Sequence, residues 1–244
     1  MTFIYNIPVK LNIPAFKSNK AANVPPKIQD SFSTNPLYDK FGDKFEIENI
    51  AKTNPKIKEL LKAYKLPLKI NSEELEKLKK GHLKDTRIVS AQIYSALPPE
   101  LKKEINQTEI QQAAMFHDYG KVLITDSILN KEGKLSEKER EIMQLHSELG
   151  YELLKNKGLD KNTLNLIKYH HQTPDGKGYP TAPNNFSYGI DFQILNTADK
   201  YAALREKRSY KDAMTRKEAL EIIKEDISKG LILQEVYDAL QKGV

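Results

Sequence analysis

The 244-residue sequence contains no cysteine and no tryptophan. The absence of thiols excludes disulfide scaffolds, thiolate zinc sites and cysteine nucleophiles, so any bound metal must be held by His, Asp or Glu. No apolar run approaches the roughly eighteen residues of a membrane span, and the N-terminus has no basic segment followed by an apolar stretch. We therefore expect a cytoplasmic protein that neither crosses a membrane nor is exported.

Charge of one sign is not in large excess either. The chain has 39 Lys and Arg against 33 Asp and Glu, a formal net charge of +6, and the two signs are mixed along the sequence. A phosphate-bearing ligand is compatible with this charge, whereas bulk nucleic-acid binding is not expected. The hydrophobic fraction of 39% is sufficient for the core of one or two globular domains.

The first fifty residues differ from the rest of the chain. They contain five of the twelve prolines and a run rich in Ser, Asn and Thr, with little helical periodicity. Apolar residues then recur at a spacing of three and four, as on one helix face, at Ile57, Leu60, Leu61 and Tyr64. The sequence predicts an irregular leader over residues 1–50 and a helical domain over residues 51–244, with its core at about 82–244.

The pattern of the domain predicts an all-α fold. Two predicted helices begin with a capping box, Ser136 with Glu139 and Thr215 with Glu218. A short extended link is expected over residues 122–124, and glycines and prolines predict a loop over residues 174–185. The predicted helices cover residues 73–97, 107–117, 136–156, 161–171, 187–207, 215–228 and 234–242.

The five histidines carry the main functional signal. The neighbours His117 and Asp118 end an apolar stretch, so a buried helix end would present an imidazole and a carboxylate together. His146 lies beside a leucine stripe, where a lone histidine is ordinarily a core or surface residue. Near a helix end, His170 and His171 could address two ions or two faces of one site, or simply face solvent at the negative end of the helix dipole.

Asp199 adds a carboxylate in a mainly apolar predicted helix, where it is costly unless it is paired or bound to a metal. With the histidines and Asp118, the chain offers five nitrogen and two carboxylate ligands, more than one ion needs. Two ions bridged by a carboxylate and a water are the economical arrangement, and zinc, manganese and iron all tolerate such ligands. The candidate ligands are His82, His117, Asp118, His146, His170, His171 and Asp199.

Two segments carry a family resemblance. Residues 117–121 read His-Asp-Tyr-Gly-Lys, and residues 170–180 read His-His-Gln-Thr-Pro-Asp-Gly-Lys-Gly-Tyr-Pro. From about His82 to the C-terminus the sequence resembles an HD-GYP domain, the branch of the HD superfamily that comprises cyclic dinucleotide phosphodiesterases. Residues 208–211 resemble an Arg-Pro-Tyr-Lys/Arg segment of that family. The resemblance implies an HD-superfamily helical bundle.

The resemblance also implies roles for particular residues. All seven candidate ligands match the family's metal ligands, with Asp118 in the bridging position, and the expected cofactors are two divalent transition-metal ions, iron or manganese, with zinc as an alternative. Lys121 matches a lysine beside the metals, and we expect Lys121 and Asp118 to be catalytic. The positions expected to hold the substrate's bases and phosphates are Tyr179, Arg208 and Lys211.

Structural interpretations of these residues stay open. Lys121 could be an ordinary lysine at a helix end, Arg208 and Lys211 an exposed basic face, and Tyr179 a buried anchor of its loop. Three positions depart from the family pattern. Leu78 stands where forms with a third metal carry Glu, Gln172 replaces the Glu after the paired histidines, and Ala202 stands where a second Asp is common.

The interpretation favoured by these motifs is a metal-dependent phosphodiesterase. It would hydrolyse a cyclic dinucleotide, cyclic di-GMP or cyclic GMP-AMP, to a linear dinucleotide through attack by a metal-bridging hydroxide. The alternatives are a receptor that binds the cyclic dinucleotide without hydrolysis and an HD hydrolase of another nucleotide, although the latter needs fewer histidines. A protein partner or a homodimer stays open.

Overall fold

The computed structural model describes residues 44–206 and 212–244, which form helices and no strand. The all-α prediction is therefore confirmed for this part of the chain. The elements, in chain order, are α2 (Lys44–Thr53), α3 (Pro55–Ala63), α4 (Ser72–Lys80), α5 (His82–Ala96), α6 (Pro99–Lys102), α7 (Gln107–Phe116), the 3₁₀ helix η2 (Tyr119–Leu123), α8 (Asp126–Leu129), α9 (Glu137–Gln144), α10 (His146–Leu154), α11 (Lys161–Tyr169), α12 (Ile190–Arg205), α13 (Arg216–Ser228) and α14 (Gln234–Gly243).

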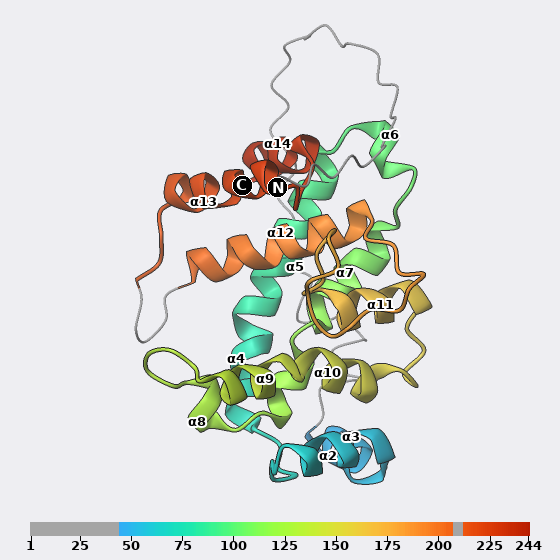
Figure 1. The fold of residues 1–244 in the computed structure, drawn as a ribbon. Coiled ribbons are helices and arrows are strands. Elements are labelled where there is room, and N and C mark those ends of the chain that lie inside the picture. Colours follow the sequence, from blue (N-terminus) through green and yellow to red (C-terminus); the bar gives the residue numbers. More distant parts are fainter. Residues whose placement is uncertain (1–43, 207–211) are drawn as a thin grey trace, which may run out of the picture.

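Helix α5 is the centre of the bundle. It runs through the middle of the molecule, and α7, α12 and α14 pack against it (Figure 1). Its side chains Leu83 and Ile93 are inaccessible to solvent and belong to one continuous apolar core. Helix α10 packs against η2 and α11, and α2 and α3 lie beyond it at one end of the bundle (Figure 1). No helix in the described ranges combines the length and apolarity that a membrane crossing needs.

Two predicted helices are each divided in the structure. The helix predicted over residues 73–97 is wrong as one element, because the backbone turns at Gly81 (φ −118°, ψ −104°) between α4 and α5. The helix predicted over residues 136–156 breaks at Leu145, which separates α9 from α10. The apolar periodicity continues across each break because both halves bury a face in the same core, as Leu78 and Leu83 do. Each break places a histidine, His82 or His146, at the start of a new helix.

The helix starts were predicted more reliably than the breaks. At Ser136 and at Thr215 the capping box is formed in both directions: the side chain accepts from the third helical N–H, and the Glu side chain accepts from the capping residue. No helix lies between Tyr169 and Ile190, so the loop predicted over residues 174–185 is confirmed.

Two local predictions need correction. Residues 44–50 were expected to be irregular but begin α2, where Ile47 and Ala51, one helical turn apart, are buried in the core. The link expected to be extended over residues 122–124 instead belongs mostly to η2, and only Ile124 is extended. The turn of η2 buries both Val122 and Leu123 in the core. The remaining leader lies outside the described residues, and the division into leader and domain stays a prediction.

Candidate metal centre

Helix ends bring the predicted ligands together in the middle of the bundle. His82 and His146 are the first residues of α5 and α10, while His117 and His170 follow the last residues of α7 and α11. Side chains at these ends can point into the space between helices that are far apart in sequence. The other three ligand candidates lie beside them: Asp118 before η2, His171 after α11 and Asp199 within α12.

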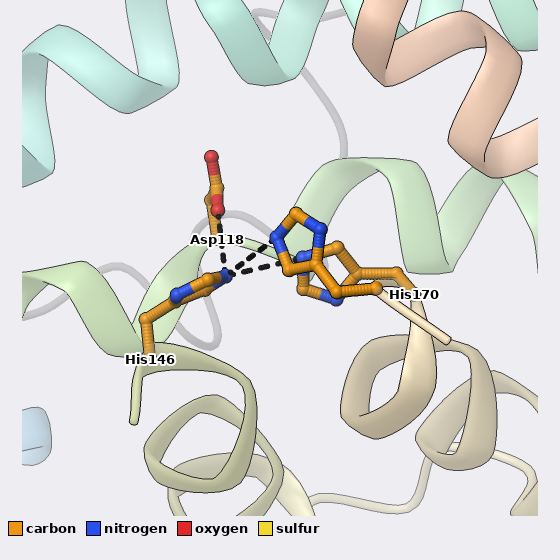
Figure 2. Close-up of side chains that lie close together, drawn as sticks. Asp118, His146 and His170 are labelled. Carbon is orange, nitrogen blue, oxygen red and sulfur yellow. Dashed lines mark hydrogen bonds and ion pairs between the residues drawn. The ribbon is translucent and has the colours of Figure 1, made fainter. Parts of the chain in front are cut away.

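The first group of ligands, here called the His146 cluster, consists of Asp118, His146, His170 and His171, whose ligand atoms lie within 4.8 Å of one another. The Nε2 atom of His146 is 3.2 Å from Nε2 of His170 and 3.3 Å from Oδ1 of Asp118, and Figure 2 shows these three side chains pointing toward one another. Nε2 of His171 also lies 3.2 Å from Nε2 of His146. Donors bound to one ion at about 2.0–2.1 Å in a tetrahedral shell lie about 3.3 Å apart. The spacing of this cluster therefore fits a single metal ion.

The second group, the His82 cluster, consists of His82, His117 and Asp118. Asp199 joins it, because its Oδ1 atom lies 2.8 Å from Nε2 of His82 and 3.6 Å from Nε2 of His117. Oδ2 of Asp118 lies 3.5 Å and 3.6 Å from the same two nitrogens. Each of the two imidazoles therefore lies near both carboxylates, although only His82, His117 and Asp118 form the group whose ligand atoms all lie within 4.8 Å of one another.

Asp118 belongs to both clusters through different oxygens. Oδ1 faces His146, whereas Oδ2 faces His82 and His117 and accepts a hydrogen bond of 2.6 Å from Nζ of Lys121. The side chain is buried, so water competes little for these oxygens. A carboxylate arranged in this way can bridge two cations, one in each cluster.

Backbone carbonyls orient three of the imidazoles. Nδ1 of His117, His146 and His170 lies 3.1, 2.6 and 2.8 Å from the carbonyl oxygen three residues earlier, at Ala114, Met143 and Ile167. A neutral imidazole that donates from Nδ1 has its lone pair on Nε2. These contacts therefore direct the Nε2 lone pairs into the clusters, as outer-shell hydrogen bonds do for metal-binding histidines.

The His146 cluster favours uncharged imidazoles. Burial lowers the pKa of His146 to about 3 and that of His171 to about 4, and it also holds the pKa of His170 well below its ordinary value. At neutral pH these rings are in the form that binds metals. In His146 and His170, which both place Nδ1 against a carbonyl, the Nε2 lone pairs face one another at 3.2 Å and repel each other unless a cation lies between them.

The carboxylates favour positive charge in the His82 cluster. Burial opposes ionisation of Asp118, but Lys121 and His117 hold the pKa of its carboxyl well below the ordinary value. Burial likewise opposes ionisation of Asp199, and its contacts with His117 and His82 lower its pKa strongly. For His117, burial acts to lower the pKa, yet the two carboxylates raise it overall. A cation is therefore stabilised where these groups meet.

One buried atom supports the fit of a metal directly. Nε2 of His117 is buried and has no hydrogen-bond partner within the described ranges, although it points at two carboxylates. An unpartnered buried nitrogen is costly unless a ligand binds it. Because the donors are imidazole and carboxylate alone, the clusters suit divalent first-row transition metals.

Close backbone contact, which sequence reasoning missed, brings Asp118 to His146. A Cβ atom added at Gly120 of η2 would lie 2.0 Å from the carbonyl oxygen of His146 and 2.5 Å from the nitrogen of Gly150 in α10. Only glycine permits η2 and α10 to pack this closely. The signal in the sequence is a glycine inside the first motif and another four residues after His146.

The remaining predicted site residues divide into described and undescribed ones. Lys121 lies beside the carboxylate of Asp118, and the ring of Tyr179 is stacked on His171 with a centroid distance of 4.6 Å.

Gln172 is buried, and its amide donates a hydrogen bond to the carbonyl of Pro180. Ala202 and Leu78, at the other two positions that depart from the family pattern, are buried core residues. Arg208 and Lys211 lie outside the described residues.

The fold and the site together define a class of protein: a helical bundle with a buried His and Asp centre that could hold metal. The family description "HD domain" matches residues 68–229, about two thirds of the sequence. The chain belongs to the HD domain family.

Two bacterial phosphodiesterases are similar to part of this chain. The chain is 40% identical over 114 residues to the cyclic di-GMP phosphodiesterase response regulator RpfG of Xanthomonas campestris pv. campestris. The aligned residues make up 46% of this chain and 30% of that protein. It is 33% identical over 135 residues to the 3'3'-cGAMP-specific phosphodiesterase 3 of Vibrio cholerae, and this alignment covers 55% of this chain and 29% of that protein. The resemblance drawn from the motifs is confirmed by these relatives, of whose length the chain spans less than a third.

A solved structure supports the fold. An HDG"Y"P protein from Bdellovibrio bacteriovorus aligns with 86% of this chain and 65% of its own, with a TM-score of 0.50 and 18% sequence identity. At this identity the likeness concerns the arrangement of helices.

Proposed function

We propose that this chain is a metal-dependent phosphodiesterase that hydrolyses a cyclic dinucleotide, cyclic di-GMP or cyclic GMP-AMP, to a linear dinucleotide. The observation that carries the proposal is the pair of buried clusters that share Asp118, with Lys121 beside the shared carboxylate. The names of the relatives, which are phosphodiesterases of these two cyclic dinucleotides, support the choice of substrate.

In this proposal the ligands are divided between two ions. His146, His170 and His171 would hold one ion, His82, His117 and Asp199 would hold the other, and Asp118 would be shared between them. When bound, the two ions would supply a water of lowered pKa as the nucleophile and positive charge for the phosphoryl oxygens. Iron or manganese is the expected metal, with zinc as an alternative.

The reaction adds water across one phosphodiester bond. The oxygen of water bonds to phosphorus, the bond between phosphorus and one sugar oxygen breaks, and the departing sugar oxygen takes up a proton. Lys121 places a positive charge next to the clusters, where it can stabilise negative charge that develops on the phosphate. The Lys121 side chain is 23% exposed, so part of it can contact a ligand that approaches from solvent.

The proposal is tested on protein purified without oxygen and loaded with metal. Elemental analysis should find about two ions per chain, and chromatography should show that cyclic di-GMP or 3'3'-cGAMP is converted to a linear dinucleotide. Cyclic di-AMP serves as a comparison substrate. Binding of a cyclic dinucleotide without turnover, at two ions per chain, would instead identify a receptor.

Lys121→Met should lower kcat by about 10²- to 10³-fold, because it removes one preorganised positive group from the reacting phosphate. Metal content should stay near two ions per chain, since Lys121 is not a ligand. Steady-state kinetics and elemental analysis measure the two effects separately.

The matched control is Lys131→Met, which removes a lysine hydrogen-bonded to Glu139 at 2.7 Å in another part of the chain. Its kcat should equal that of the parent. If Lys121→Met leaves kcat unchanged at full metal occupancy, Lys121 serves only to neutralise Asp118.

Arg208→Ala and Lys211→Ala should each weaken binding of the cyclic dinucleotide by about 1–3 kcal/mol, the value of a charge-assisted contact. Metal content should not change. Calorimetric titration of metal-loaded protein carrying Lys121→Met, which turns over slowly, gives the affinities. Equal affinity with and without these side chains would assign both to a solvated basic surface.

A further inference from the structure

His171 is oriented differently from the other ligands of the His146 cluster. His146 and His170 each place Nδ1 against a carbonyl three residues earlier, within their own helical segment. Among the described residues, the imidazole of His171 has no such contact, and the one hydrogen-bond neighbour of this ring is Nε2 of His146. It follows the end of α11, so no regular helix geometry fixes its ring.

An aromatic ring takes the place of that contact. The ring of Tyr179 lies parallel to the imidazole of His171, with a centroid distance of 4.6 Å and an interplanar angle of 28°. It also meets His146 edge-on, at 6.2 Å and 80°. Tyr179 is half-buried, and loss of water around it raises the pKa of its phenol. One face of the tyrosine is therefore occupied by a metal-ligand candidate.

The loop that carries Tyr179 is fixed on both sides of that residue. The backbone N–H of Tyr179 donates to the carbonyl of His171 at 3.3 Å, and a Cβ added at Gly178 would lie 2.1 Å from the same oxygen. On the other side, the buried amide of Gln172 donates to the carbonyl of Pro180. The Gly-Tyr-Pro segment is thus held against the two residues that follow His170, and the ring of Tyr179 has little freedom to leave His171.

We propose that Tyr179 is a positioning residue for the metal centre: its ring, held by the Gly178 contact and the Gln172–Pro180 hydrogen bond, fixes the plane of His171 so that Nε2 faces the His146 cluster. This inference rests on the metal centre of the proposed function but not on its substrate. The phenol hydroxyl plays no part in the stacking, so phenylalanine can replace tyrosine in this role.

The test uses the full chain and Co²⁺ alone as the probe, without substrate. Co²⁺ is titrated into metal-free parent protein, Tyr179→Leu and Tyr179→Phe, and its visible d–d absorption reports both affinity and ligand geometry. Tyr179→Leu should bind one of two Co²⁺ ions about 10- to 100-fold more weakly, the usual effect of losing an outer-shell partner, with an altered spectrum. Tyr179→Phe should retain the affinity and spectrum of the parent.

Two controls separate positioning from general destabilisation. Tyr94→Leu removes another half-buried tyrosine, near the far end of α5, and should leave Co²⁺ binding unchanged. Thermal denaturation of the metal-free proteins shows whether Tyr179→Leu is folded. If that variant does not fold, Tyr179→Ile replaces it as the variant without a ring and should show the same weaker binding and altered spectrum, while Tyr179→Phe keeps the ring and should keep the parent spectrum.

The results that overturn the inference are distinct from those that overturn the proposed function. If Tyr179→Leu is folded and binds two Co²⁺ ions with the parent's affinity and spectrum, Tyr179 does not position His171. A changed spectrum in Tyr179→Phe also contradicts the inference, because the hydroxyl would then be involved. If the parent itself binds no Co²⁺, the metal centre and the proposed function fail together.

Discussion

Asp118→Asn should reduce bound metal from about two ions to fewer than one per chain and lower kcat by about 10³-fold or more. The substitution keeps the shape of the side chain but removes the charge that both clusters share. Oδ1 and Oδ2 face opposite clusters at 3.3 Å from His146 and 3.5 Å from His82. An amide has one uncharged oxygen, so it could serve at most one cluster and would supply negative charge to neither. Loss of a single preorganised group already costs about 10²- to 10³-fold, and here two ions are affected.

Elemental analysis and steady-state kinetics on metal-loaded protein measure this prediction. Asp160→Asn is the matched control, because it makes the same chemical change at an exposed position that caps α11 without a side-chain hydrogen bond. The control should keep two ions and full activity. Two tightly bound ions in Asp118→Asn would show that Asp118 does not bridge the clusters.

Gly120→Ala should lower the free energy of unfolding by about 3 kcal/mol, the upper end of the usual cost of overpacking. The added methyl group would meet backbone atoms, at 2.0 Å from the carbonyl oxygen of His146 and 2.5 Å from the nitrogen of Gly150, and backbone cannot rotate away as a side chain can. Because η2 and α10 must then separate, Asp118 and His146 move apart, and metal binding should weaken as well.

Gly150→Ala provides the contrasting variant at the same helix contact. A methyl group there would lie 3.3 Å from the nitrogen of Gly120 and at least 3.6 Å from other neighbours, so only a small shift is needed. Alanine also gains about 0.5–1 kcal/mol over glycine inside a helix. Its stability should stay within about 1 kcal/mol of the parent. Urea unfolding of the metal-free proteins checks both variants, and equal stability of the two would contradict the close-packing argument.

Much of the fold followed from local patterns. The capping boxes at Ser136 and Thr215 predicted where α9 and α13 begin, because these caps depend only on residues three positions apart. The breaks at Gly81 and Leu145 were not predicted, since the apolar spacing on either side continues through them. Helix α2 was not predicted either, because it adjoins a segment that contains several prolines. Its apolar residues Ile47 and Ala51 are buried where α2 packs against α10, which only the structure shows.

The sequence predicted which residues form the candidate site, but it did not predict how they are arranged in space. The types and order of the ligands, with the two motifs that contain them, were sufficient for a resemblance to the HD-GYP domain and for the expectation of a centre with two ions. They did not show that His170 and His171 both join the same cluster, because neighbours within a helix point about 100° apart. That arrangement exists because His171 lies beyond the end of α11.

By itself, then, the sequence determined the helical class, the exclusion of thiolate chemistry and the residues able to bind metal, because each depends on residue type or on spacing within one segment. The tertiary structure alone decided that the two oxygens of Asp118 face different clusters, that Gly120 permits η2 to meet α10, and that Tyr179 lies on His171. These features join residues from separate segments of the chain. The distances between these residues depend on how the helix ends pack in three dimensions, and no pattern within one segment of the sequence predicts them.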